Sequence, residues 1–249
     1  MVDFSVCIEM VYDDDPFHDR IRRAAAAGAD AVEFWDWREK DLDAIRTAAA
    51  GRTPYRRVYC RRRPHRPGGD RRDSRNHSRV DFDGFGPRLS DAHRDHGSRP
   101  RRRKSGGAAR ERRRDTRAVA EDAEGADVTL VVEPLNTAVD HPGYFLTDTA
   151  EGIDIVREVD SPGVKLLYDV YHQQVTEGNV VETITENVDH IGHVHIADVP
   201  GRHEPGTGEI RYENVLAAID DADYDGYVGC EFTPTVDPDE ALAATFALD

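Results

Sequence analysis

The stretch "GVKLLYDVYHQQVTEGNVVETITENVDHIGHVHIADV", residues 163–199, decides the fold. An apolar run opens it at 163–172 and another closes it at 191–199, and both runs predict strands. The segment "VVETITENV" between them predicts a helix. A strand, a helix and a strand at this short spacing indicate neighbouring parallel strands in a sheet that helices cover.

The same alternation continues towards both ends of the chain. Further strands are predicted at 4–12, 30–37, 127–136 and 226–232, and further helices at 18–29, 39–50, 149–159, 212–222 and 239–248. The pattern is that of the α/β class, and 249 residues is a usual length for one (β/α)8 TIM barrel. Six strands are predicted, so such a barrel needs two more.

The segment 51–117 lies where those two strands belong, and its composition is unlike the rest of the chain. It contains the run "RRVYCRRRPHRPGGDRRDSRNHSR", and only 11 of its 67 residues are apolar. A strand of a parallel sheet needs a nearly continuous apolar run, which this segment lacks. It cannot bury enough surface to offset the entropy of ordering it. We therefore expect a single TIM-barrel domain over 1–249 whose third and fourth βα units are replaced by an Arg-rich, irregular segment.

The charge of this segment is also opposite in sign to that of the rest of the chain. Residues 51–117 hold 23 Lys and Arg against 8 Asp and Glu, whereas the rest of the chain holds 10 against 41. Such an excess of acid repels itself at low ionic strength and is typical of halophilic proteins. Concentrated salt shortens the screening length to about 3 Å at 1 M. The flanking sequence therefore suggests a halophilic protein of a salty cytoplasm.

Other composition signals favour a cytoplasmic protein with no membrane association. The opening "MVDFSVCIEMVY" has two acids and no basic n-region, so we expect a first strand there and no signal peptide. No apolar run approaches the roughly 20 residues of a membrane span. The three cysteines, Cys7, Cys60 and Cys230, are far apart and form no CxxC pair. They indicate neither a disulfide framework nor a zinc site.

Several stretches of the chain carry a family resemblance. "EPLNTAVDHPGYFL", "LLYDVYHQQVTEGN", "IGHVHIADVPGRHEPGTGEIRYENV" and "GYVGCEF" follow one another within 127–232, and "VEFWDW" lies at 32–37. With these stretches the chain resembles hydroxypyruvate isomerase, within the xylose-isomerase-like TIM-barrel superfamily of sugar isomerases and epimerases. The resemblance skips 51–117, where the third and fourth strands of that family should lie.

This skip suggests an origin for the Arg-rich segment. Arg, Pro, Gly, Ser and His dominate what GC-rich coding DNA yields in the wrong frame, so we infer compensating frameshifts near residues 50 and 117. The competing interpretation is a genuine basic insertion that binds nucleic acid. It would leave an open barrel with exposed strand edges. Translating the other reading frames across 51–117 distinguishes the frameshift from the genuine insertion. A frameshift requires that one of those frames encodes apolar strands.

Four predicted strands end in side chains that can bind a cation, namely Glu133, Asp169, His195 and Glu231. In a TIM barrel the active site is built at the carboxyl ends of the strands. Three carboxylates and one imidazole converging there would repel one another unless a cation lay among them. This donor set suits Mg²⁺ or Mn²⁺ better than zinc. The resemblance implies that the same four residues bind one divalent metal.

The resemblance also implies a reaction. It would interconvert hydroxypyruvate and tartronate semialdehyde by metal-assisted proton transfer through an enediolate, with Glu133 and Glu231 as the acid/base pair. A ketose 3-epimerase or an inosose dehydratase of the same superfamily is the alternative, although the loop "VPGRHEPGTGE" favours hydroxypyruvate isomerase. From a different class, the chain is an inactive frameshifted product or a nucleic-acid-binding protein that uses the Arg-rich segment.

Further residues are predicted to contact a small-molecule substrate. His172 could hydrogen-bond a substrate oxygen, its alternative being an ordinary loop histidine. Arg202 could hold a substrate carboxylate bidentately. Glu209 lies in the same Gly- and Pro-rich loop, a lid candidate. Glu33 and Trp35, two apart on one strand face, could line the pocket. We expect no nucleic-acid partner, and the family suggests a homo-oligomer.

The halophilic interpretation predicts how stability depends on salt. The unfolding free energy of the full-length protein should rise as KCl is added, because salt screens the repulsion among the acidic side chains. Urea titrations at several KCl concentrations measure this dependence. A protein that is equally stable without added salt would contradict the interpretation.

Overall fold

The computed structural model describes residues 1–35, 37, 40–49, 58–61, 120–121, 123–125 and 128–249, with the backbone alone for 58–61. The strands of this part form one seven-stranded sheet in the order β3-β2-β1-β7-β6-β5-β4, and every pairing is parallel. Their bounds are β1 Asp3–Cys7, β2 Ala31–Trp35, β3 Val58–Arg61, β4 Leu130–Val132, β5 Val164–Asp169, β6 Ile191–Ile196 and β7 Tyr227–Cys230.

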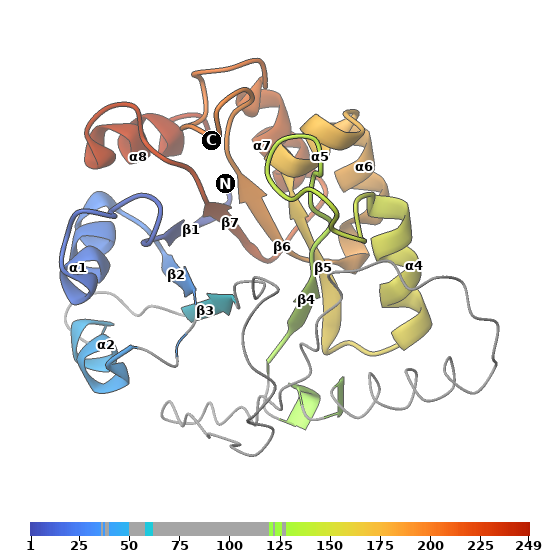
Figure 1. Cartoon of the computed structure of the whole chain (residues 1–249), viewed down its shortest axis with the longest axis horizontal. Coiled ribbons are helices and arrows are strands. Elements are labelled where there is room, and N and C mark those ends of the chain that lie inside the picture. The colour runs from blue at the N-terminus through green and yellow to red at the C-terminus, as the bar shows by residue number, and fades with distance from the viewer. Residues whose placement is uncertain (36, 38–39, 50–57, 62–119, 122, 126–127) are drawn as a thin grey trace.

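Helices connect these strands and lie around the outside of the sheet (Figure 1). Their bounds are α1 Phe17–Ala27, α2 Leu42–Ala49, α4 Thr149–Val159, α5 Val170–Thr176, α6 Val180–Asn187, α7 Tyr212–Asp221 and α8 Pro238–Phe246, with a short 3-10 helix at Val188–His190.

Local sequence signals determine where several of these helices begin or end. The Asp148 side chain accepts a hydrogen bond from the backbone N of Glu151 at 2.9 Å and begins α4. Gly28, with a φ of 102°, ends α1 in the left-handed conformation.

The first strand lies between the second and the last, as in a barrel. β1 pairs with β2 on one side and with β7 on the other. The two ends of the chain lie side by side next to β1. The backbone N of Val2 donates to Asp249 Oδ2 at 2.9 Å. The predicted α/β class and parallel barrel architecture are confirmed. Among the residues described, no helix combines the length and apolar character that crossing a bilayer requires.

Two expectations about individual strands need correction. The expectation that no strand forms within 51–117 is wrong at Val58–Arg61, which pairs with β2 as β3. Val and Tyr favour strands, and a strand this short needs no long apolar run. The other residues of that segment lie outside the described part of the chain. The strand predicted at 163–172 is shorter, because the Asp169 side chain accepts from the backbone N of His172 at 3.2 Å and begins α5.

The core is built from apolar side chains that the strands and the inner faces of the helices bury. On the strands, Val6, Val32, Leu166 and Val228 are fully buried. Parallel sheets are covered on both faces, so their strands are apolar almost throughout. Polar side chains that are buried within this sheet therefore require a specific explanation.

The packing of α4 on the sheet generates a prediction about Gly152. A Cβ at Gly152 would lie 2.6 Å from Leu166 Cδ1 and 3.2 Å from the Pro134 ring. Gly152→Ala should therefore lower the unfolding free energy by about 1–3 kcal/mol through overpacking. The control is Gly125→Ala, where no atom of the described residues lies within 4 Å of the new Cβ. It should be neutral or stabilising by up to about 1 kcal/mol. Urea unfolding measures both, and equal effects would contradict this packing.

Candidate functional site

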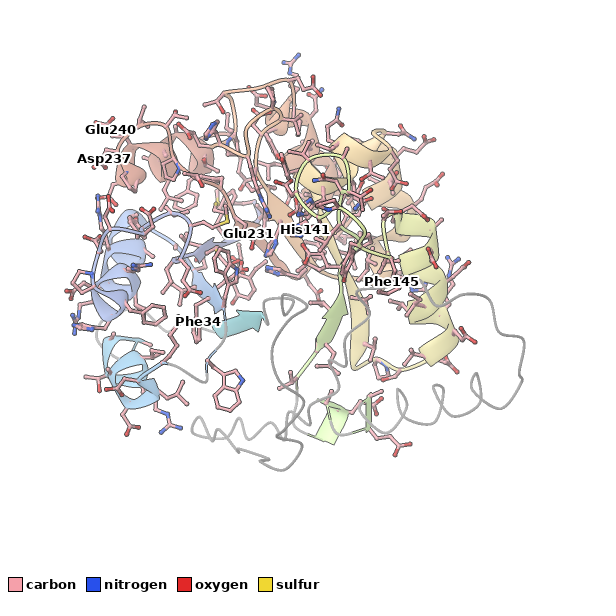
Figure 2. The ribbon with its side chains drawn as sticks, viewed as in Figure 1. Phe34, His141, Phe145, Glu231, Asp237 and Glu240 are labelled. Atoms are coloured by element: carbon pink, nitrogen blue, oxygen red, sulfur yellow. The ribbon has the colours of Figure 1, made fainter. Side chains whose placement is uncertain are left out.

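The four predicted metal ligands converge. Glu133 directly follows β4, Asp169 ends β5, His195 lies at the end of β6 and Glu231 directly follows β7. One ligand atom from each lies within 4.8 Å of the others. The geometry follows from the topology, because the carboxyl ends of parallel strands meet at one edge of the sheet. Figure 2 shows Glu231 in the middle of the molecule, close to the end of β7.

The donor set fits a hard divalent cation. Ligand atoms bound about 2.1–2.5 Å from one ion lie at most about 4–5 Å apart, which agrees with the 4.8 Å limit of this cluster. Three carboxylates and one imidazole are typical of Mg²⁺ or Mn²⁺ sites. Asp169, His195 and Glu231 are 1–2% exposed, and Glu133 is partly buried. The residues present can therefore hold such an ion away from bulk water.

Positive charge from the protein balances these carboxylates in the structure. Arg202 Nη2 lies 2.6 Å from Glu231 Oε2 and 3.2 Å from Asp169 Oδ2. His195 Nδ1 lies 3.1 Å from Glu231 Oε2. Burial lowers the pKa of the His195 imidazole, but Glu231 and Glu33 outweigh burial and raise this pKa well above its usual range. The carboxylates of the site are therefore stabilised by nearby positive charge, which Arg202 and His195 supply.

Arg202 lies on a loop, residues 199–210, that is closely tied to the barrel. The buried carboxylate of Asp198 accepts hydrogen bonds from four backbone amides of this loop at 2.9–3.1 Å, those of Val199, Gly206, Gly208 and Ile210. The backbone O of Arg202 accepts from Thr233 N at 3.0 Å. Arg202 itself has a φ of 58°, in the left-handed region. These bonds hold the predicted lid loop in the conformation that directs the guanidinium at the carboxylates.

A second set of contacts supports the guanidinium from the side of α5. The Arg202 Cζ lies 5.2 Å from the centroid of the Tyr171 ring, a cation–π contact. The Tyr171 hydroxyl donates to Asp140 Oδ2 at 2.9 Å. Asn136 Nδ2 donates to the same oxygen at 2.9 Å. Sequence reasoning missed Tyr171 and Asp140, because only the folded chain brings the loop after β4 against α5.

His172 is a buried residue of α5, so the alternative of an ordinary loop histidine is wrong. Its Nδ1 lies 2.7 Å from Asn136 Nδ2. Its Nε2 lies 3.5 Å from Asp169 Oδ2. Figure 2 shows His141 close to Glu231 in the view, and the His141 ring centroid lies 5.3 Å from that of His172. His172 therefore lies directly beside a candidate metal ligand, and its predicted contact with a substrate oxygen stays a prediction.

The structure assigns different contacts to Glu33 and Glu209 from those predicted. Glu33 is buried, and its described partners are Ser5, His193 and His195. Its predicted place in the pocket wall stays a prediction. Glu209 is exposed, and its described side-chain partner is Gln174 on α5 at 3.3 Å. The structure does not bring Glu209 into the cluster of candidate ligands.

Two other residues join the site. The indole Nε1 of Trp35 donates to Glu231 Oε1 at 3.3 Å, which agrees with the predicted pocket-lining position. His193 was not predicted, although it lies two residues before His195 and therefore on the same face of β6. The spacing in "HVH" was the signal that could have revealed it.

Comparisons with known proteins agree with this architecture. Residues 89–247 match the family model described as Xylose isomerase-like TIM barrel. The chain is 42% identical over 116 residues to hydroxypyruvate isomerase of Escherichia coli, covering 47% of this chain and 45% of that protein. It is 42% identical over 115 residues to 2-oxo-tetronate isomerase of Cupriavidus necator, covering 46% and 44%. A crystal structure of an AP endonuclease, family 2, from Brucella melitensis has a TM-score of 0.71 and 25% identity, covering 99% and 98%.

The chain spans about half the length of the curated relatives it matches. The family model covers more of the chain and includes all four converging ligand candidates and the loop 199–210. The chain therefore belongs to the xylose isomerase-like TIM barrel family.

Proposed function

We propose that this protein is an isomerase of small hydroxy-keto acids that interconverts hydroxypyruvate and tartronate semialdehyde. The observation that carries the proposal is the convergence of Glu133, Asp169, His195 and Glu231 within 4.8 Å at the carboxyl ends of four neighbouring strands. The likeness to relatives named hydroxypyruvate isomerase and 2-oxo-tetronate isomerase agrees with it. Such a site can bind the oxygens on two adjacent substrate carbons. It can also hold carboxylates beside those two carbons.

The reaction moves hydrogen between neighbouring carbons. The C–H bond of the hydroxymethyl carbon breaks, a C–H bond forms at the former carbonyl carbon, and the hydroxyl proton moves to the neighbouring oxygen. One carboxylate oxygen of Glu133 or Glu231 removes the first proton, and the other residue delivers a proton to the second carbon. Glu133, Asp169, His195 and Glu231 would hold a divalent cation, which would supply positive charge against the negative charge that develops on the substrate oxygens. Trp35 donates to Glu231 Oε1 at 3.3 Å and holds this carboxylate in position for its transfer.

Arg202 favours a substrate that carries a carboxylate. Its guanidinium lies beside Asp169 and Glu231 at the candidate site and can bind a substrate carboxylate bidentately. Asp198 holds the loop that carries Arg202, and Tyr171 contacts the guanidinium, so less entropy is lost on binding. A neutral ketose offers this guanidinium no carboxylate, so the contact favours a keto-acid isomerase over a ketose 3-epimerase.

The alternatives outside this class have less support. A frameshifted, inactive product would be expected to lose the support of its ligands, yet the described residues alone bring the four together. Outside 51–117 the chain holds 41 acidic against 10 basic residues, and this charge opposes binding to a polyanion. A metal-dependent turnover of a small anionic substrate is the function that fits both observations.

Replacing either proposed acid/base residue tests the reaction. Glu133→Gln and Glu231→Gln should each lower kcat for hydroxypyruvate by about 10²- to 10⁴-fold, because general acid/base catalysis contributes about that factor. Steady-state kinetics with added Mn²⁺ measures this. The control is Glu186→Gln, an exposed position of α6, which should keep wild-type activity. Wild-type kcat in the double variant would overturn the assignment.

The proposed role of Arg202 predicts a loss that depends on the substrate. Arg202→Met removes a charged hydrogen bond worth about 1.5–3 kcal/mol, so kcat/KM for hydroxypyruvate should fall about 10- to 100-fold. Most of the loss should appear in KM, since the bond is present before and during the reaction. Arg202→Lys keeps the charge and should recover part of the loss. An equal loss for a neutral ketose would contradict carboxylate recognition.

A further inference from the structure

A second buried polar cluster shares His195 with the candidate metal site. It consists of Ser5 of β1, Glu33 of β2, and His193 and His195 of β6. All four residues are at most 6% exposed. Since β2 and β6 are separated in the sheet by β1 and β7, the cluster connects strands that do not pair with each other. The reaction proposed above does not use Ser5, Glu33 or His193 directly.

Glu33 accepts hydrogen bonds on both of its carboxylate oxygens. Its Oε2 accepts from His195 Nε2 at 2.8 Å, and its Oε1 accepts from His193 Nε2 at 3.0 Å and from the Ser5 hydroxyl. The other nitrogen of the His195 ring, Nδ1, lies 3.1 Å from Glu231 Oε2. The imidazole of His195 therefore bridges a buried carboxylate on one side and the candidate metal ligands on the other.

These contacts determine which nitrogen of His195 carries hydrogen when a metal is bound. Both carboxylate oxygens of Glu33 are occupied by contacts with Ser5, His193 and His195, and a carboxylate placed among three donors accepts hydrogen bonds from them. Because His195 Nε2 must then donate, its Nδ1 directs a lone pair at the metal site. Carboxylate–histidine–metal arrangements orient ligands in this way.

The neighbouring strand leaves room for the cluster. A Cβ at Gly229 of β7 would lie 2.2 Å from Glu33 Oε1, 2.7 Å from His195 Cδ2 and 3.0 Å from His193 Nε2. Any side chain at this position would occupy the space that the cluster fills. A buried carboxylate with two imidazoles also costs solvation free energy, and apolar residues would stabilise a barrel interior at least as well. Stability alone therefore does not account for these residues.

We propose that Glu33 and His193 are positioning residues of the metal centre, with Glu33 fixing the tautomer and orientation of His195 and His193 holding Glu33. This inference rests on the proposed function, because it assumes that His195 binds a metal. Glu33, His193 and His195 also qualify as a small ligand cluster of their own. However, the 2.8 and 3.0 Å separations are ordinary hydrogen-bond lengths, so we assign these contacts to hydrogen bonds.

Metal binding without substrate tests the proposal. Mn²⁺ is titrated into the chelator-treated full-length chain, with affinity and stoichiometry followed by calorimetry. The wild type should bind one ion, and Glu33→Gln should bind it about 10- to 100-fold more weakly. Glu33→Asp, which keeps the charge, should recover part of this loss. Asp30→Asn is the control, because Asp30 accepts from Phe4 N at 3.0 Å just before β2 begins and should affect metal affinity little.

A spectroscopic readout separates positioning from a general loss of structure. In the Mg²⁺-loaded protein labelled with ¹⁵N-histidine, the His195 ring should show the Nε2–H tautomer, and Glu33→Gln should shift this signal. Gly229→Ala leaves every polar group in place but crowds the cluster, and it should weaken Mn²⁺ binding in the same direction. If Glu33→Gln does not fold, this second variant and the wild-type tautomer still decide the proposal.

The outcomes distinguish this inference from the proposed function. A wild-type chain that binds no divalent ion would overturn the proposed function itself. Wild-type binding with unchanged affinity in Glu33→Gln and Gly229→Ala would overturn only the positioning role. Two bound ions in the wild type, one of them lost in Glu33→Gln, would instead show that Glu33 and the two histidines form a separate metal site.

Discussion

The repulsion among buried carboxylates at one edge of the sheet is the constraint on which the rest of the site depends. Parallel strands all end at the same edge, so Glu133, Asp169 and Glu231 cannot avoid one another once β4, β5 and β7 are formed. Buried charges of one sign are very costly unless opposite charge lies among them. Arg202 and His195 supply that charge in the structure, and a divalent cation would supply more of it. The barrel topology thus brings together negative charges that a bound cation would balance.

The surrounding contacts keep this charge balance in one geometry. Asp198 fastens the loop that carries Arg202 through four backbone amides, and Glu33 fastens the ring of His195 through its Nε2. Both carboxylates are buried, and both are satisfied by donors that the fold places around them. Buried carboxylates therefore anchor Arg202 and the candidate ligand His195. Catalytic groups held in this way need little reorganisation when a substrate binds.

How much of this was predictable depends on the range of each interaction. Periodicity and strand-end chemistry are local signals, and they predicted six of the seven described strands, most helices and the convergence of the four candidate ligands. The partnership of Glu33 with His193 joins residues 160 positions apart, and no local pattern encodes it. Arg202 was predicted as a substrate ligand, but its contacts with Asp169 and Glu231 required the folded loop. The strand Val58–Arg61 was missed because its short favourable run lies within a segment whose average composition opposes strands.

The arrangement of the sheet also explains how a complete ligand cluster can coexist with the unusual segment 51–117. The four ligand candidates come from β4 to β7, which neighbour one another and lie entirely C-terminal to that segment. The supporting residues Ser5, Glu33 and Trp35 come from the N-terminal part. They reach the cluster because β1 pairs directly with β7, and β2 with β1. Within the described part of the chain, the site therefore depends on the pairing of the first strand with the last.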